Sequence, residues 1–96
     1  MSTHSEELLI QSAMYGDVVG VAKLLVGGCS PNCVDAQGMT ALHMSAVNNN
    51  AAIIALLILA GADVNAAGPV GMTPLAMARA NRAAEAADML VLGGAE

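Results

Sequence analysis

The stretch GMTALHMSAVNNNAA, residues 38–52, returns almost unchanged as GMTPLAMARANRAAE, residues 71–85. When the chain is shifted by 33 positions, residues 35–63 align with residues 68–96, and 11 of the 29 aligned pairs are identical. The same shift towards the N-terminus finds a weaker copy in the first third of the chain. Self-similarity at a fixed period is typical of stacked repeat proteins. We therefore expect a single domain over residues 1–96, built of three units at roughly residues 2–34, 35–67 and 68–96.

The middle unit is predicted to begin with a short helix. Thr40 is placed to cap it, because a threonine side chain accepts a hydrogen bond from the free N–H groups at a helix start. The apolar side of this helix includes Leu42, Ala46 and Val47, which lie at helical spacing. The three asparagines at 48–50 then end it, since asparagine favours caps and turns over helix interiors.

A second helix of the same unit is predicted from about Ala51 to Ala60, and Gly61 supplies the left-handed residue that ends it. The loop that follows contains Gly68-Pro69, a dipeptide that marks a turn. Near the N-terminus, Thr3 and Glu6 have the spacing of a capping box, which predicts a helix start there. Each unit is therefore expected to be a pair of short helices followed by a loop.

The composition limits the classes of function. The net charge is −5 with only three basic residues, so the chain lacks the basic surface of a nucleic-acid-binding protein. The longest apolar run, residues 51–62, has 12 residues, which is short of the ~20 that a membrane span needs. The N-terminus carries acidic residues where a secretion signal carries basic ones. We expect no nucleic-acid or membrane partner, and reduced thiols at Cys29 and Cys33 in the cytoplasm, with the nucleus as the alternative.

The segment of residues 35–66, DAQGMTALHMSAVNNNAAIIALLILAGADVNA, resembles an ankyrin repeat. The typical pattern of that family is D-x-x-G-x-T-P-L-H-x-A, followed by L-L and by G-A-D-V-N. The residues that match it are Asp35, Gly38, Thr40, Leu42, His43, Ala46, Leu57, Gly61, Ala62, Asp63, Val64 and Asn65. The third unit keeps the G-x-T-P-L segment from Gly71 to Leu75 but has Ala76 in place of the histidine. The resemblance covers essentially the whole chain.

This resemblance implies an all-α ankyrin-repeat solenoid of three stacked helix-turn-helix units with short β-turn fingers. Three units are about the smallest stack that buries a continuous core. Met1 favours a true start of the chain, whereas the end at Glu96 leaves open whether a longer array continues. The leucine-rich context before Asn65 is similar to that of ankyrin asparagines that are hydroxylated, with a purely structural role as the alternative.

No set of residues predicts catalysis, a metal site or a cofactor. His43 stands at the family's Leu-His position, which implies a structural brace that bonds threonine and backbone, and no nucleophile or carboxylate accompanies it. Cys29 and Cys33 with His4 and His43 do not have a recognised zinc spacing. We therefore expect a non-enzymatic protein that works through a binding surface, with no metal and no cofactor.

The resemblance implies that a protein partner meets the concave face, formed by the fingers and the first helix of each unit. Met39 and Met72, at equivalent positions of two fingers, are expected to project as adaptable contacts for an apolar peptide or helix. A tolerated, non-functional loop is the alternative. The predicted contact residues are Met14, Tyr15, Val34, Ala36, Gln37, Met39, Val47, Asn48, Pro69, Val70, Met72 and Asn81.

The opposite, convex face supports a second hypothesis. No Asp, Glu, Lys or Arg occurs from Ala36 to Ala62, and the second helices carry apolar residues where the family has charged ones. Such a surface is either an interface or a liability for solubility. The alternative function is therefore a structural subunit of a homo-oligomer or a larger complex, through Val19, Ala22, Val26, Ala52, Ala55 and Leu59.

Overall fold

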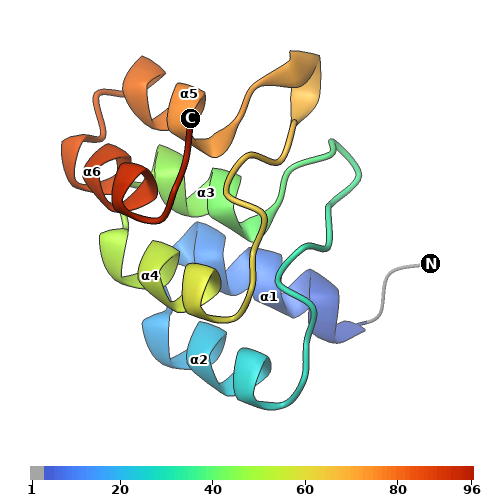
Figure 1. The fold of residues 1–96 in the computed structure, drawn as a ribbon. Coiled ribbons are helices and arrows are strands. Elements are labelled where there is room, and N and C mark those ends of the chain that lie inside the picture. Colours follow the sequence, from blue (N-terminus) through green and yellow to red (C-terminus); the bar gives the residue numbers. More distant parts are fainter. Residues whose placement is uncertain (1–3) are drawn as a thin grey trace.

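The computed structural model of the chain describes residues 4–96, so the capping box expected at Thr3 lies outside the described residues. Over this range the backbone forms six α-helices, one 3₁₀ turn at Pro69–Gly71, and one isolated antiparallel bridge between Val34 and Thr40 (Figure 1). The helices are α1 (His4–Tyr15), α2 (Val18–Val26), α3 (Ala41–Val47), α4 (Ala51–Leu59), α5 (Pro74–Ala80) and α6 (Ala84–Leu92). The predicted all-α class is confirmed.

The helices are arranged as two parallel rows (Figure 1). The first helices of the units form one row, in which α3 contacts both α1 and α5. The second helices form the other row, in which α4 contacts both α2 and α6. Within each unit the two helices pack on each other, and the loops after α2 and α4 extend to one side as fingers (Figure 1). This is the stacked solenoid that the repeat predicts.

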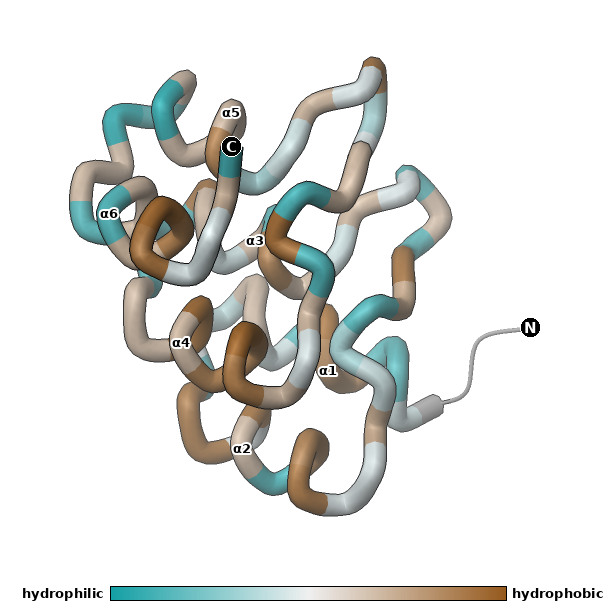
Figure 2. Tube along the Cα trace, viewed as in Figure 1, coloured by the Kyte–Doolittle hydropathy of each residue, from teal (hydrophilic) through white to brown (hydrophobic). Residues whose placement is uncertain are grey.

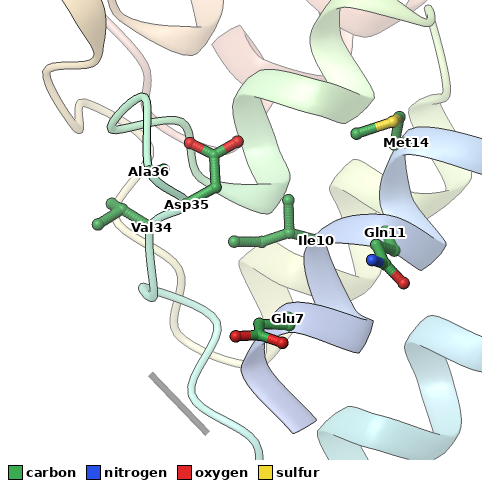
Figure 3. Close-up of a pocket in the computed structure, with 7 residues that line it drawn as sticks. All are labelled: Glu7, Ile10, Gln11, Met14, Val34, Asp35 and Ala36. Carbon is green, nitrogen blue, oxygen red and sulfur yellow. The ribbon is translucent and has the colours of Figure 1, made fainter. Parts of the chain in front are cut away.

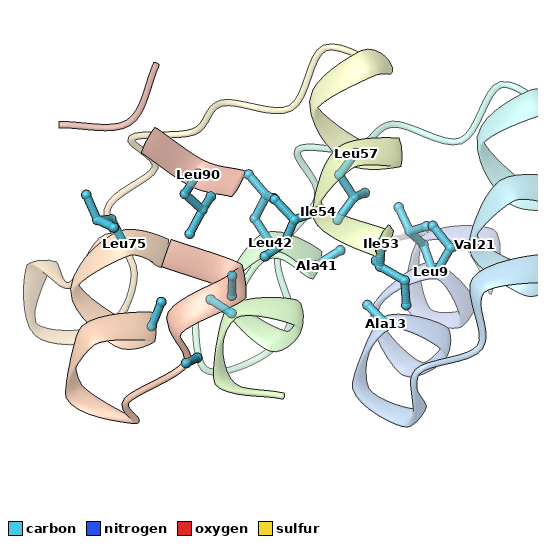
Figure 4. Close-up of a cluster of buried hydrophobic side chains, with 14 residues drawn as sticks. Leu9, Ala13, Val21, Ala41, Leu42, Ile53, Ile54, Leu57, Leu75 and Leu90 are labelled. Carbon is cyan, nitrogen blue, oxygen red and sulfur yellow. The ribbon is translucent and has the colours of Figure 1, made fainter. Parts of the chain in front are cut away.

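The hydrophobic core lies between the two rows (Figure 4). The first helices contribute small residues such as Ala13, Ala46 and Ala78, which let neighbouring helices approach closely. The second helices contribute larger aliphatic side chains such as Ile54 and Leu57, which are completely buried. Because most of the core is shared between adjacent units, no unit could bury its apolar side alone.

The predicted helix boundaries around the asparagine cluster are confirmed. The Thr40 side chain accepts a hydrogen bond from the N–H of His43 at the start of α3. The Asn50 side chain caps α4 in the same way by accepting from Ile53, and Gly61 ends that helix with a φ of 96°. The placement of Val47 on the apolar side of α3 is wrong, because this last residue of the helix is 40% exposed.

No helix within residues 4–96 has both the length and the apolar character needed to cross a membrane.

Candidate partner-binding surface

The predicted contact residues gather on the first helices and the fingers, the side that we call the concave face. Most of them are exposed there, with Met14 and Tyr15 at the end of α1, Val47 at the end of α3, and Val70 on the second finger. The other exposed members of the predicted set are Val34, Ala36, Gln37, Asn48 and Asn81. The structure therefore exposes most of the predicted residues, on the fingers and at the C-terminal ends of the first helices.

The expectation for the two finger methionines is wrong. Met39 and Met72 are half-buried, so their side chains do not project freely from the fingers. The N–H of Met39 donates to the carboxylate Oδ1 of Asp35 at 2.9 Å, and its carbonyl accepts from the N–H of Asp35 at 3.0 Å. Met72 lies at the equivalent place in the second finger, where Pro69 is also half-buried. These methionines therefore form the base of each finger and leave its tip to other residues.

Val70 is the tip of the second finger. Its side chain is 95% exposed, and its backbone has a φ of 51° and a ψ of 27°. This left-handed conformation is unfavourable for a β-branched residue, and residues held in it often belong to functional sites. The turn is closed by a hydrogen bond from the N–H of Gly71 to the carbonyl of Gly68 at 3.0 Å. The structure thus presents an apolar side chain to solvent at a strained position.

His43 connects the second unit to the base of this finger. Its Nδ1 accepts a hydrogen bond from the backbone N–H of Thr40 at 3.1 Å. Because Nδ1 is an acceptor, Nε2 carries the ring proton and donates to the carbonyl of Met72 at 2.8 Å. Gly68 lies flat against the ring, since a Cβ at that position would come within 2.7 Å of Nε2. The predicted bracing role of His43 is confirmed.

The first finger has no such brace, and a hollow of about 450 Å³ lies at the corresponding place (Figure 3). Ile10 of α1 occupies the position that His43 has in α3, and it cannot donate a hydrogen bond to the finger. Asp35 occupies the position of Gly68 and turns its carboxylate towards its own loop, where Oδ1 accepts from Gln37 and Met39. The hollow lies between α1 and the finger, and is lined by Glu7, Ile10, Gln11, Met14, Val34, Asp35 and Ala36.

The ends of the second helices, on the convex face, are rich in hydrophobic residues (brown in Figure 2). Val26, Leu59 and Leu92 lie at equivalent positions of the three units and are 90%, 85% and 81% exposed. We call these three residues the convex row. Shallow apolar hollows lie beside it, one between α2 and α4 and one between α4 and α6. Of the residues predicted for this face, Val19 and Ala52 are also exposed, whereas Ala22 and Ala55 are half-buried.

A comparison with protein families agrees with this arrangement. The family model described as ankyrin repeats (3 copies) matches residues 9–96. The chain belongs to the ankyrin-repeat family. No curated protein matches the chain. Ankyrin repeats are generally non-enzymatic modules for protein–protein interaction.

Asparagine side chains fix the spacing of the ankyrin units. Asn48 donates to the carbonyl of Met14 at 2.6 Å, so this predicted contact residue already ties α3 to the first unit. Asn49 accepts from the N–H of Ala86 at 2.9 Å and donates to the carboxylate of Glu85, which lowers the pKa of Glu85. The sequence shows these residues only as a turn, because contacts between units are invisible in a local pattern. These bonds hold the concave face in one shape.

A second pair of asparagines, at the ends of the first and second units, forms one hydrogen bond that recurs between successive units. Asn32 accepts from the N–H of Asp63 at 2.7 Å, and Asn65 accepts from the N–H of Glu96 at 2.9 Å. The two bonds are equivalent under the 33-residue shift. Asn65 thus has the structural role that the sequence left open, although its side chain is exposed. Its hydroxylation stays a prediction.

The two thiols are held in their protonated form. Partial burial, the neighbouring Cys29 and the charge of Glu6 raise the pKa of Cys33 to about 11. Partial burial and Glu6 also raise the pKa of Cys29. Cys33 donates its S–H to the carbonyl of Glu6, and both ring nitrogens of His43 are engaged in hydrogen bonds. No three metal-ligating side chains come together among those that the structure describes, and the side chain of His4 lies outside them.

Proposed function

We propose that this ankyrin chain is an adaptor module that binds a protein partner through its concave face. The observation that carries the proposal is Val70, an almost fully exposed apolar side chain held in a left-handed conformation at a fingertip. Selection for stability alone would replace it by glycine or asparagine. Exposed Met14 and Val47 extend the apolar surface from the finger along the first helices. The free thiols, which suit a reducing compartment, support a cytoplasmic location.

The rigidity of this face also supports binding. The brace at His43 and the bond from Asn48 to Met14 fix the first helices relative to the second finger. A surface that is already ordered loses little conformational entropy when a partner docks, so more of the contact energy appears as affinity. A face built for binding is expected to combine such order with exposed apolar residues.

The test compares two pairs of substitutions to glutamate at equivalent positions. Gln37→Glu with Val70→Glu changes both fingertips, and the matched control, Val19→Glu with Ala52→Glu, changes the first turns of α2 and α4 on the convex face. The control adds the same charge where the helix dipole favours it, and the third unit already has Glu85 at this position. Both pairs should keep the helical circular dichroism of the parent chain.

The measurement is affinity capture from extract of the cells that express the chain, with the bound proteins quantified by mass spectrometry. We expect the fingertip pair to lose the partner, because each buried carboxylate without a counter-charge costs a few kcal/mol. The control pair should retain it. Loss of the partner by the control pair alone would place the binding surface on the convex face.

A second candidate function is a structural subunit that assembles through the convex face. The convex row favours it, since three large aliphatic side chains recur at the same exposed place in every unit. Exposed apolar surface that continues across a whole molecule usually marks an interface. The two candidates use opposite faces and do not exclude each other.

A further inference from the structure

The hollow beside α1 exists because the first unit lacks the residues that fill the equivalent space in the second unit. In the second unit, the ring of His43 fills the space between the first helix and the next finger, and Gly68 makes room for it. In the first unit, Ile10 leaves that space unfilled and Asp35 replaces the glycine. The volume of about 450 Å³ is within the ~300–1,000 Å³ that is usual for ligand sites. The first unit therefore has an open hollow at the place where the second unit has the His43 brace.

The lining of the hollow combines an apolar wall with two carboxylates. Ile10 points from α1 towards the finger and is only 4% exposed (Figure 3), whereas Met14 and Val34 also line the hollow and are exposed. Glu7 stands on the helix side and Asp35 on the finger side (Figure 3). Among the described residues, Glu7 has no hydrogen-bond partner, and Asp35 uses only Oδ1. None of the residues that line the hollow is basic.

The distribution of charge over the chain points in the same direction. The net charge is −5, and the three basic residues lie elsewhere, with Lys23 on α2, Arg79 in the last turn of α5 and Arg82 in the turn after it. An anionic occupant would therefore be repelled, and a purely apolar one would bury carboxylates without a counter-charge. A lysine or arginine side chain avoids both costs, because it places an aliphatic stem on apolar surface and a cationic head at the rim.

We propose that this hollow is a docking site for a basic side chain, lysine or arginine, of the protein partner. The aliphatic stem lies along Ile10 and Met14, and the cationic head is held between the carboxylates of Glu7 and Asp35. The inference rests on the proposed use of the concave face and adds the chemistry of the residue that is recognised there. Electrostatic complementarity of this kind selects among partners and speeds their approach more than it raises affinity.

The experiment pans the immobilised full chain against a displayed library of random short peptides. We expect the bound peptides to be enriched in lysine and arginine that have an apolar neighbour. The strongest peptide is then synthesised in two forms, one with its basic residue and one with norleucine in that place, and both are titrated into isotope-labelled chain. The basic form should shift the methyl signals of Ile10, Met14 and Val34, with at least roughly 5-fold tighter binding than the norleucine form.

Two variants with the same change of charge identify the site. Glu7→Gln with Asp35→Asn removes both carboxylate charges from the hollow and keeps an oxygen at Asp35 to accept the loop hydrogen bonds. The control is Asp88→Asn with Glu96→Gln, which removes two charges from exposed positions on α6 and at the end of the chain. The first variant should lose the preference for the basic peptide, and the second should keep it.

The outcomes separate this proposal from the proposed function. Peptides that shift signals of the concave face without any basic preference would overturn the docking site and leave the concave module standing. The same holds if the variant at Glu7 and Asp35 keeps the full preference. Peptides that bind only to the convex face, or a library that yields no binder, would count against both.

Discussion

Single side chains decide what is fixed and what is free on the surface of this chain. Asn49 makes two hydrogen bonds to the third unit, and His43 bonds the carbonyl of Met72 across the same boundary. Loss of such a hydrogen bond between units lowers the free energy of unfolding. Val70, two residues before Met72, makes no comparable contribution and carries an unfavourable backbone conformation. Stability and function are therefore divided between neighbouring residues.

The first prediction concerns Val70→Asn. Asparagine tolerates the left-handed conformation far better than a β-branched residue, so the free energy of unfolding should rise by about 0.5–1 kcal/mol. Urea unfolding followed by circular dichroism measures it. The control is Gln37→Asn at the equivalent place of the first finger, which does not have a positive φ and should change stability by less than about 0.5 kcal/mol. An equal gain at both positions would show that Val70 is not strained.

The second prediction concerns the reactivity of Cys33. With its pKa raised from 9.0 to about 11, the thiolate fraction at pH 8 is roughly a hundredfold lower than in the unfolded chain, and alkylation should be slower by a similar factor. Because the folded-state pKa lies above the unfolded value, the folded chain keeps this proton longer than the unfolded one, and the free energy of unfolding falls as the pH rises from 9 to about 11. Iodoacetamide labelling of folded and urea-unfolded chain, read by peptide mass, checks this. Equal rates at pH 8 would contradict it.

Local patterns explain which residues could be predicted. The capping role of Thr40 and the turn at the asparagines follow from preferences within a few residues of sequence, and both are confirmed. The half-buried state of Met39 could not be predicted, because the burial of a finger residue depends on contacts outside its own loop, which a local pattern does not show. The hollow beside Ile10 was equally hidden, since it results from two substitutions 25 residues apart that meet only in the fold.

At the scale of the helix, burial separates neighbouring leucines of α4. Leu57 is completely buried between the two rows, whereas Leu59 is 85% exposed on the convex face. The sequence AAIIALLIL is apolar all round, so its periodicity cannot tell which side faces the core. Under the 33-residue shift Leu57 aligns with Leu90 and Leu59 aligns with Leu92, so the repeat alone does not separate the two positions either; the fold buries the first pair completely and exposes the second.

The third prediction tests this division. Leu57→Ala should lower the free energy of unfolding by about 2–5 kcal/mol, because the side chain loses its transfer energy and leaves a cavity between the rows. A small domain has only about 5–15 kcal/mol of stability in total, so the variant should be largely unfolded at body temperature. Leu59→Ala in the same helix is the control and should cost less than about 0.5 kcal/mol. Thermal unfolding of both variants gives the answer, and similar melting temperatures would contradict the assignment.

At the scale of the whole molecule, the stacking of units makes two continuous faces out of repeated positions. The fingers and first helices carry the exposed Met14, Val47 and Val70, and the second helices carry the convex row. The residues of the convex row are spaced by the distance between units, and a partner built of the same units has its own residues at the same spacing. A second copy of the chain is such a partner, and it would bind by a two-fold contact in which each row meets the other.

The last prediction follows from this geometry. If the convex row is an interface between copies, light scattering at rising concentration should show the mass increase from 9.6 kDa towards twice that value. Leu59→Lys should hold the chain as a monomer, because Leu59 is the middle residue of the row and a two-fold contact would bring the lysines of both copies together. Lysine is favourable near the C-terminal end of α4, so the fold is retained.

Ala36→Lys on the first finger is the control for this experiment, since it adds the same charge at an exposed position away from the convex face. It should associate as the parent chain does. A mass of 9.6 kDa for the parent at every concentration, or association that survives Leu59→Lys, would remove the two-fold contact. Either result leaves the test of the concave face unchanged, because Leu59 does not lie on the fingers or the first helices. The exposed valine and the two exposed leucines of the convex row would then be explained by a different protein that covers them.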